Sequence, residues 1–204
     1  MLTTERLVHP GGYHTPWHSH HAGQLWRIAA GLLVIETPLG RSVVPAKHIG
    51  WIPPGQQHAA FSESAIEGCA VYLDPAHCEG LPEEATLFES DDFTDALFSR
   101  LSVAGSEYDP RKLILLLEEL ALASQVRFYL PVPTDPRLKN VVRKLLQSVD
   151  DNQTVESHAS RAGMSVRTFN RRFSAETGMN FVNWRQLARV MQAMEWLAAG
   201  KPVG

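Results

Sequence analysis

Two histidines near the amino terminus, His18 and His20, have the spacing of side chains that act together. Alternate residues of a β-strand point to the same face, so the two imidazoles are expected on one side of a strand. Gln24 follows four residues after His20, and His58 ends the segment Pro53-Pro54-Gly55-Gln56-Gln57-His58. Imidazole nitrogens and amide oxygens either exchange hydrogen bonds or bind a divalent metal.

The pattern G-x5-H-x-H-x3-Q-x6-G followed by P-x-G-x2-H resembles the two motifs of the cupin superfamily, over about Leu7 to Leu73. That resemblance implies a small β-barrel in which His18, His20 and His58 bind a metal, with Gln24 in place of the family's glutamate. Zn²⁺, Ni²⁺, Mn²⁺ and Fe²⁺ all suit three imidazoles and an amide oxygen, although the missing carboxylate weakens the site. The alternative is that the histidines hydrogen-bond to one another, to water or to an organic effector.

Three tryptophans, Trp17, Trp26 and Trp51, flank these histidines in the sequence. They are expected either to line a pocket for a flat or apolar effector or to pack as ordinary barrel core.

A second set of residues, in the segment Thr154 to Gly178, has the types that read DNA. Gly163 permits a tight turn between two short helices, and Ser165 caps the second helix. Phe169 and Phe173, four residues apart, face inward. The side chains left on the exposed face are Arg167, Thr168, Asn170, Arg171 and Arg172. Arginine pairs with guanine and asparagine with adenine, as a recognition helix in a major groove requires.

From Asp135 to Gly204 the chain resembles the DNA-binding domain of AraC-type transcriptional regulators. The matching positions are Ser165, Arg167, Arg171, Phe173, Gly178, Trp184, Arg185, Arg189 and Leu197. The resemblance implies two helix-turn-helix units joined by a long helix, here Phe181 to Ala199. The second unit would begin at about Lys201, so we expect the sequence to be truncated at its carboxyl end.

Hydrophobic periodicity indicates the elements that position these residues. Short Val-, Ile- and Trp-rich stretches punctuated by glycine predict strands up to about Pro75. Helices are predicted for 91–103, 109–125, 135–149, 154–161, 166–176 and 181–199. The segment Phe128 to Pro136, rich in proline, is predicted to be an extended linker.

The fold class is therefore α+β, a cupin barrel followed by an all-α helix-turn-helix module. We expect a cupin sensor domain over 1–80, a helical dimerisation segment over 81–130 and the DNA-binding domain over 134–204. The helix 109–125 is apolar on two faces, which favours a homodimer in which Leu113, Leu116, Leu117 and Leu120 are buried.

Charge supports this division. The chain has 204 residues and a net charge of −3, yet the part from Asp135 onward holds eleven Lys and Arg against six Asp and Glu. A basic carboxyl-terminal third is typical of nucleic-acid binding. No apolar run is long enough for a membrane span and no leader follows Met1, so a cytoplasmic protein with two free cysteines is expected.

These observations predict a DNA-binding transcriptional regulator that senses a metal ion or small molecule, acts on double-stranded DNA and is not an enzyme. The alternatives are a cupin metalloenzyme, a dioxygenase or isomerase with an accessory helical domain, and a fragment that only senses and dimerises.

Overall fold

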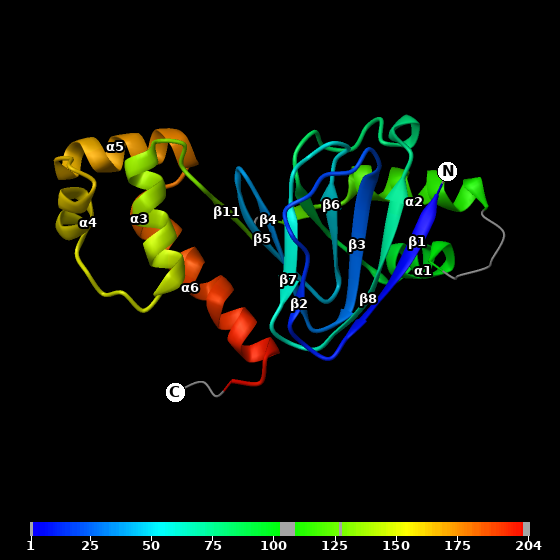
Figure 1. Ribbon diagram of the computed structural model, residues 1–204. Coiled ribbons are helices and arrows are strands. Elements are labelled where there is room, and N and C mark those ends of the chain that lie inside the picture. The colour runs from blue at the N-terminus through cyan, green and yellow to red at the C-terminus, as the bar shows by residue number, and fades with distance from the viewer. Residues whose placement is uncertain (1, 103–108, 127, 202–204) are drawn as a thin grey trace.

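Two antiparallel sheets form the amino-terminal barrel in the computed structural model, which describes residues 2–102, 109–126 and 128–201 (Figure 1). The larger sheet has the strand order β1-β8-β3-β6-β9-β10, and the smaller sheet has the order β11-β5-β4-β7-β2. The strands are β1 (Thr3–His9), β2 (Tyr13–His14), β3 (Gly23–Ala30), β4 (Leu32–Thr37), β5 (Gly40–Pro45), β6 (His48–Ile52), β7 (Ala59–Ser62), β8 (Ile66–Leu73), β9 (Thr86–Glu89), β10 (Gln125–Val126) and β11 (Tyr129–Pro131). A core that includes Leu7, Trp26, Leu33 and Ile35 fills the barrel.

One glycine is indispensable to the barrel's first long hairpin. Gly31 connects β3 to β4 with φ +81°, a conformation that L side chains rarely adopt. A Cβ atom at this position would lie 2.1 Å from the carbonyl oxygen of Ala65. The turn therefore requires a residue without a side chain for two independent reasons.

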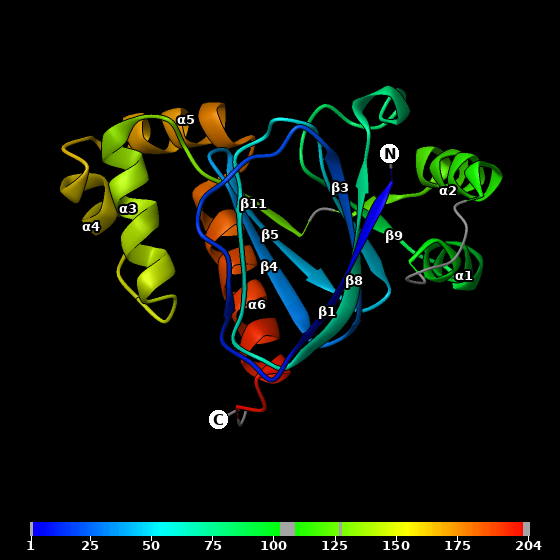
Figure 2. The ribbon, with the colours of Figure 1, turned by 45° about the vertical axis from the view of Figure 1, so that its right-hand side comes forward.

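Two helices, α1 (Asp92–Leu101) and α2 (Pro110–Leu122), cover the outer face of the larger sheet (Figure 2). A short 3₁₀ turn, η1 (Pro75–His77), precedes them. Asp91 and Thr94 form a reciprocal capping box at the start of α1, and Asp109 caps α2 with Pro110 in its first turn.

The carboxyl-terminal helices lie on the opposite side of the barrel. They are α3 (Pro136–Gln147), α4 (Val155–Arg161), α5 (Val166–Thr177) and α6 (Phe181–Ala198). One continuous core joins them to the smaller sheet: Val34 and Val43 of the barrel belong to the same cluster as Phe173 and Trp184. The barrel and the helical module therefore share buried apolar surface.

Two sequence-based boundaries differ from the structure. The segment 81–130 is not purely helical, because β9 and β10 pair with each other and β9 extends the larger sheet. The expected linker contains β11, whose Tyr129 lies opposite Ser42 of β5. Strands β10 and β11 satisfy the backbone hydrogen-bonding groups at a sheet edge. The local composition of these segments does not reveal that stabilising contribution.

Helix 109–125 also ends early, at Leu122, and its apolar faces were assigned wrongly. Leu113, Leu116 and Leu120 are buried against this chain's own sheet and α1. The large apolar side chains that this helix leaves exposed are those of Ile114, Leu115 and Leu122. Val103 of the predicted helix 91–103 lies outside the described residues.

Within the described residues, no helix is both long and apolar enough to traverse a lipid bilayer. Cys69 and Cys78 are free thiols, and burial raises the pKa of each.

Candidate metal and DNA-binding sites

The three histidines singled out by the sequence converge in the barrel. His18 and His58 form an antiparallel bridge, in which each backbone N–H donates to the carbonyl of the other at 2.9 Å. His20 lies just before β3, and its ring centroid is 5.0 Å from that of His58. One nitrogen from each of the three rings lies within 4.8 Å of the others.

Backbone carbonyls orient all three rings in the same way. The Nδ1 atoms of His18, His20 and His58 lie 2.7, 2.6 and 2.9 Å from the carbonyl oxygens of Pro16, Ala22 and Gln56. A carbonyl only accepts hydrogen bonds, so each neutral ring carries its proton on Nδ1 and directs the Nε2 lone pair elsewhere. Metal-binding histidines use the same arrangement, in which Nδ1–H donates to a backbone carbonyl and Nε2 faces the metal.

The Nε2 atom of His58 is the metal-binding candidate whose surroundings are most distinctive. His58 is fully buried, and its Nε2 has no hydrogen-bond partner among the described residues. Burial, together with the neighbouring His18 and His20, lowers the pKa of His58 to about 4. The ring is therefore neutral at physiological pH, which is the state that binds a metal ion.

Gln24 completes the cluster from β3. Its Oε1 lies 3.0 Å from Nε2 of His20, and the Gln24 side chain is buried. With the His20 proton on Nδ1, two acceptors face each other, so either a cation lies between them or the Gln24 amide is rotated to donate. The donor set thus fits a divalent transition metal with Gln24 as fourth ligand.

The three tryptophans do not line one pocket. Trp26 faces the barrel interior, with its ring 5.6 Å from that of His58. Trp51 is paired with Leu25, belongs to the outer core under α1 and α2, and donates from Nε1 to the Pro82 carbonyl at 2.8 Å. Trp17 is 53% exposed. Neighbouring strands place Trp26 and Trp51 on opposite faces because side chains alternate.

The DNA-reading helix predicted from the sequence is α5. Ser165 caps it by accepting from the Thr168 backbone N–H, and Gly178 ends it with φ 68°. Phe169 and Phe173 are completely buried and contact Phe181 of α6. The inner face of α5 is thus fixed, and its outer face is free for a ligand.

The predicted DNA contacts divide into two groups. Arg167, Asn170 and Arg171 are exposed, and none has an ion pair or side-chain hydrogen bond within the described part of the chain. Thr168 is half-buried, and its hydroxyl accepts from that of Ser165 at 3.0 Å. Arg172 is already engaged: its Nη1 lies 2.6 Å from Oδ2 of Asp135, the residue that caps α3.

Sequence reasoning missed several residues that hold the helical module together. His158 is buried against Phe181, and burial lowers its pKa. Arg185 and Arg189 of α6 donate to backbone carbonyls of residues 149–153, which fixes the loop between α3 and α4. Their positions belonged to the family resemblance, but no local pattern reveals these long-range acceptors.

The junction between the barrel and α6 also escaped sequence analysis. Arg41 of β5 donates from Nη2 to both carboxylate oxygens of Glu195 at 2.7 Å, and its guanidinium lies over the Phe61 ring. Closer to the start of α6, Trp184 Nε1 donates to the Pro131 carbonyl at 2.7 Å. Two polar contacts therefore fasten α6 to the smaller sheet.

Comparisons with known proteins agree with this architecture. The family model of a helix-turn-helix domain matches residues 158–204. The HTH-type transcriptional regulator NimR of Escherichia coli is 26% identical over 193 residues, which are 93% of this chain and 71% of that protein. The chain is thus similar to HTH-type transcriptional regulators, and its residues 158–204 match a helix-turn-helix domain. Its amino-terminal domain is a double antiparallel sheet that brings the three histidines together, as the resemblance to the cupin motifs predicted.

Other known proteins match part or nearly all of this chain. RipA, an HTH-type transcriptional regulator of Corynebacterium glutamicum, is 34% identical over 68 residues, or 33% of this chain and 20% of that protein. The solved structure of the AraC-like transcriptional activator CuxR superposes with a TM-score of 0.44 and 12% identity, covering 97% of this chain and 81% of that one.

Proposed function

We propose that this chain is an AraC-type transcriptional regulator that reads double-stranded DNA through the outer face of α5. The observation that supports the proposal is that Arg167, Asn170 and Arg171 are exposed and have no partner among the described residues, on a helix whose opposite face is packed into a core. Arg167 and Arg171 lie one turn apart, about 6 Å along the helix axis, so they address neighbouring base pairs in one groove.

The test is a salt-controlled titration against a duplex selected from a random-sequence pool. Arg171→Ala should cost about 1–3 kcal/mol of binding and relax selectivity at one position. Arg172→Ala is the matched comparison, because its guanidinium is held by Asp135. Arg172→Ala should weaken the binding of all DNA sequences to the same extent. If Arg171→Ala leaves sequence discrimination unchanged, α5 is not the reading helix.

We further propose that a divalent transition metal, Zn²⁺, Ni²⁺, Mn²⁺ or Fe²⁺, binds to His18, His20 and His58, with Gln24 as a weaker fourth ligand. The buried and unpartnered Nε2 of His58 supports this proposal. A bound metal would act as effector or as a structural link within the barrel. His58→Ala should abolish metal uptake. His48→Ala, on a ring that lies outside the cluster, should not.

Metal content is measured by elemental analysis after purification without chelator and by Zn²⁺ titration of the stripped protein. Failure of the unmodified protein to retain or take up any of the four metals contradicts the metal proposal. It leaves the DNA proposal intact, because the two sites lie in different parts of the fold.

The regulator is also proposed to act in the cytoplasm as a homodimer through the outer face of 109–125. Ile114, Leu115 and Leu122 are 53%, 37% and 83% exposed, and a two-fold pair would bury them. Leu122→Glu should shift sedimentation towards monomer, whereas Val8→Glu on β1 should not. A monomeric unmodified protein at high concentration contradicts this proposal. The curated relatives are transcription regulators, and we propose no enzymatic reaction.

A further inference from the structure

Helix α5 carries three arginines, and the residue that begins α3 neutralises one of them. Arg167 and Arg171 have no carboxylate partner among the described residues. Arg172 Nη1, in contrast, lies 2.6 Å from Oδ2 of Asp135. The Arg172 side chain is 44% exposed, so burial does not keep it from a ligand. The ion pair with Asp135 therefore decides how much of this positive charge α5 offers to an anion.

Asp135 lies in surroundings that proteins commonly give to a phosphate group. Its Oδ1 accepts from the Arg137 backbone N–H at 2.9 Å, at the amino terminus of α3. Its Oδ2 lies 3.0 Å from Nη2 of Arg137 and 2.6 Å from Nη1 of Arg172. A helix amino terminus and guanidinium groups bind phosphate in the same way. These contacts hold the pKa of Asp135 well below its usual range, so the carboxylate is ionised at neutral pH.

A second carboxylate, that of Glu176, lies one helical turn after Arg172 on α5. Its Oε2 accepts from the backbone N–H groups of Thr134 and Asp135, each at 2.8 Å, and from the Thr134 hydroxyl at 3.0 Å. Glu176 has no ion pair within the described part of the chain. Both carboxylates thus connect α3 to α5, but of the two it is Asp135 that neutralises an arginine of α5.

The charge on Arg172 matters because contacts to the DNA backbone are electrostatic. Each cation that pairs with a phosphate releases counterions from the DNA, which raises the affinity and steepens its dependence on salt. A guanidinium that first has to leave Asp135 exchanges one charge-assisted hydrogen bond for another, so its net gain is small. Phosphate contacts carry no sequence information, and the effect therefore applies to every duplex.

We propose that Asp135 competes with DNA phosphates for Arg172 and thereby limits how tightly the helical module binds any DNA sequence. The proposal rests on the proposed function only in taking DNA as the ligand of α5. It concerns the strength of the backbone contact, whereas the reading of bases was assigned to Arg167 and Arg171. In this view Asp135 is an internal substitute for the phosphate that Arg172 contacts in the complex.

The experiment measures binding of the full chain to a duplex of unrelated sequence by fluorescence anisotropy, over salt concentrations from about 50 to 200 mM. Asp135→Asn removes the charge, and asparagine caps a helix as well as aspartate does. We expect about threefold or more tighter binding at the lowest salt, and a slope of log affinity against log salt that is steeper by about 1. Asp135→Ser, which also preserves the cap, should behave in the same way.

Glu176→Gln is the matched control. It changes the net charge equally, one turn from Arg172, but releases no arginine, and its amide oxygen still accepts from the α3 backbone. Its affinity should rise by less than about twofold and its salt slope should stay unchanged, because solvent and salt screen a charge that makes no direct contact. Urea unfolding of each variant verifies that the fold is retained.

The role of Arg172 is tested by adding Asp135→Asn to Arg172→Ala. In that background the gain should fall to the level of Glu176→Gln. A gain that persists without Arg172 overturns the proposal, and so does an Asp135→Asn variant that binds no more tightly than Glu176→Gln, as a purely capping role predicts. Discrimination between sequences in Arg171→Ala is a separate measurement. If it stays unchanged while Asp135→Asn shows the expected gain, the reading helix is wrong and this inference stands.

Discussion

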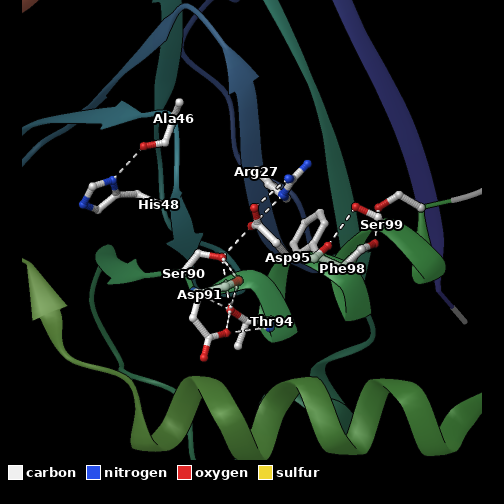
Figure 3. A network of polar contacts seen from close by, with 10 residues as sticks. Arg27, Ala46, His48, Ser90, Asp91, Thr94, Asp95, Phe98 and Ser99 are labelled. Atoms are coloured by element: carbon white, nitrogen blue, oxygen red, sulfur yellow. Dashed lines mark hydrogen bonds and ion pairs between the residues drawn. The ribbon is translucent and has the colours of Figure 1, made fainter.

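Two arginine–carboxylate pairs fasten helices to opposite sides of the barrel, and they are built differently. Arg27 of β3 holds Asp95 of α1 with two nitrogens, Nε and Nη2, each 2.7 Å from its own oxygen (Figure 3). Arg41 holds Glu195 of α6 with Nη2 alone, which contacts both oxygens. The first pair matches the planar geometry of both groups, and the second leaves one buried donor unused.

The surroundings of the two carboxylates widen this difference. Hydrogen bonds from Arg27 and from the Ser90 hydroxyl, with the charge of Lys47, lower the pKa of Asp95 against the effect of its burial. Burial, together with the charges of Glu36 and Glu63, raises the pKa of Glu195 although Arg41 opposes it. The surroundings of Asp95 therefore favour its ionised form. For Glu195, the attraction to Arg41 does little more than compensate for the cost of removing the two charged groups from water. The Arg27–Asp95 pair thus stabilises the packing of α1, whereas the Arg41–Glu195 pair adds little to the apolar core that joins α6 to the smaller sheet.

Glu195→Ala is expected to have the largest effect. It leaves the Arg41 guanidinium, 13% exposed, without its carboxylate, so the variant should lose about 3–5 kcal/mol of unfolding free energy in urea. The double variant Arg41→Leu/Glu195→Leu should recover to within about 1 kcal/mol of the unmodified protein, because an apolar replacement removes the desolvation cost as well. A double variant as unstable as the single one would show that the ion pair itself contributes strongly.

Asp95→Ala should have a smaller effect, about 1–3 kcal/mol, since Arg27 is 20% exposed and water can solvate it. The same urea titration measures it, and Asp92→Ala, on an exposed residue of the first turn of α1, is the control. If Asp95→Ala proves more destabilising than Glu195→Ala, the contrast between the two sides fails.

The pH dependence of the two pairs should differ in sign. Glu195 has a folded pKa above the ordinary 4.5, so the folded state binds more protons between those values and gains stability as pH falls through them. Asp95 has a folded pKa below the ordinary 3.8, so its contribution is present above 3.8 and is lost as pH falls towards the folded value. The unfolding free energy is measured against pH for the unmodified protein and for the Glu195→Gln and Asp95→Asn variants. The difference between the unmodified protein and each variant isolates the contribution of that carboxylate. Two profiles with the same slope would contradict the assignment.

The smallest effect is expected at an exposed pair. Arg6 and Glu67 lie 3.6 Å apart with side chains 79% and 60% exposed. Glu67→Gln should change the unfolding free energy by about 0.5 kcal/mol or less, because solvent screens the attraction. A larger loss would mean that position on the sheet, not burial, decides what an ion pair contributes here.

Local signals explain what could be predicted from the sequence. The predicted helices 109–125, 135–149 and 166–176 begin within one residue of α2, α3 and α5, because the capping residues Asp109, Asp135 and Ser165 act within one helical turn. The histidine cluster followed from motif spacing. The DNA-contacting role of α5 stays a prediction, although its exposed arginines agree with it.

Long-range pairing explains what could not be predicted. Strand β11 exists because β5 presents an open edge, and the Arg41–Glu195 contact joins residues 154 positions apart. The separation of Trp26 from Trp51 depends on the register Leu25 opposite Trp51. The ion pair of Arg172 likewise depends on how α3 packs against α5. None of these relations leaves a trace in the neighbouring sequence.

Two polar contacts anchor helix α6 to the smaller sheet, and their positions have a mechanical consequence. Trp184 near its start bonds to Pro131, and Glu195 near its end bonds to Arg41. The two residues are about 16 Å apart along the axis. With both contacts in place, α6 cannot rotate relative to the sheet. Without the Glu195 contact, α6 would be able to rotate about Trp184. A turn of about 10° would then carry the Glu195 end roughly 3 Å across the sheet. The Arg41–Glu195 contact thus restrains the carboxyl-terminal end of α6, and Trp184 would be the pivot if that restraint were removed.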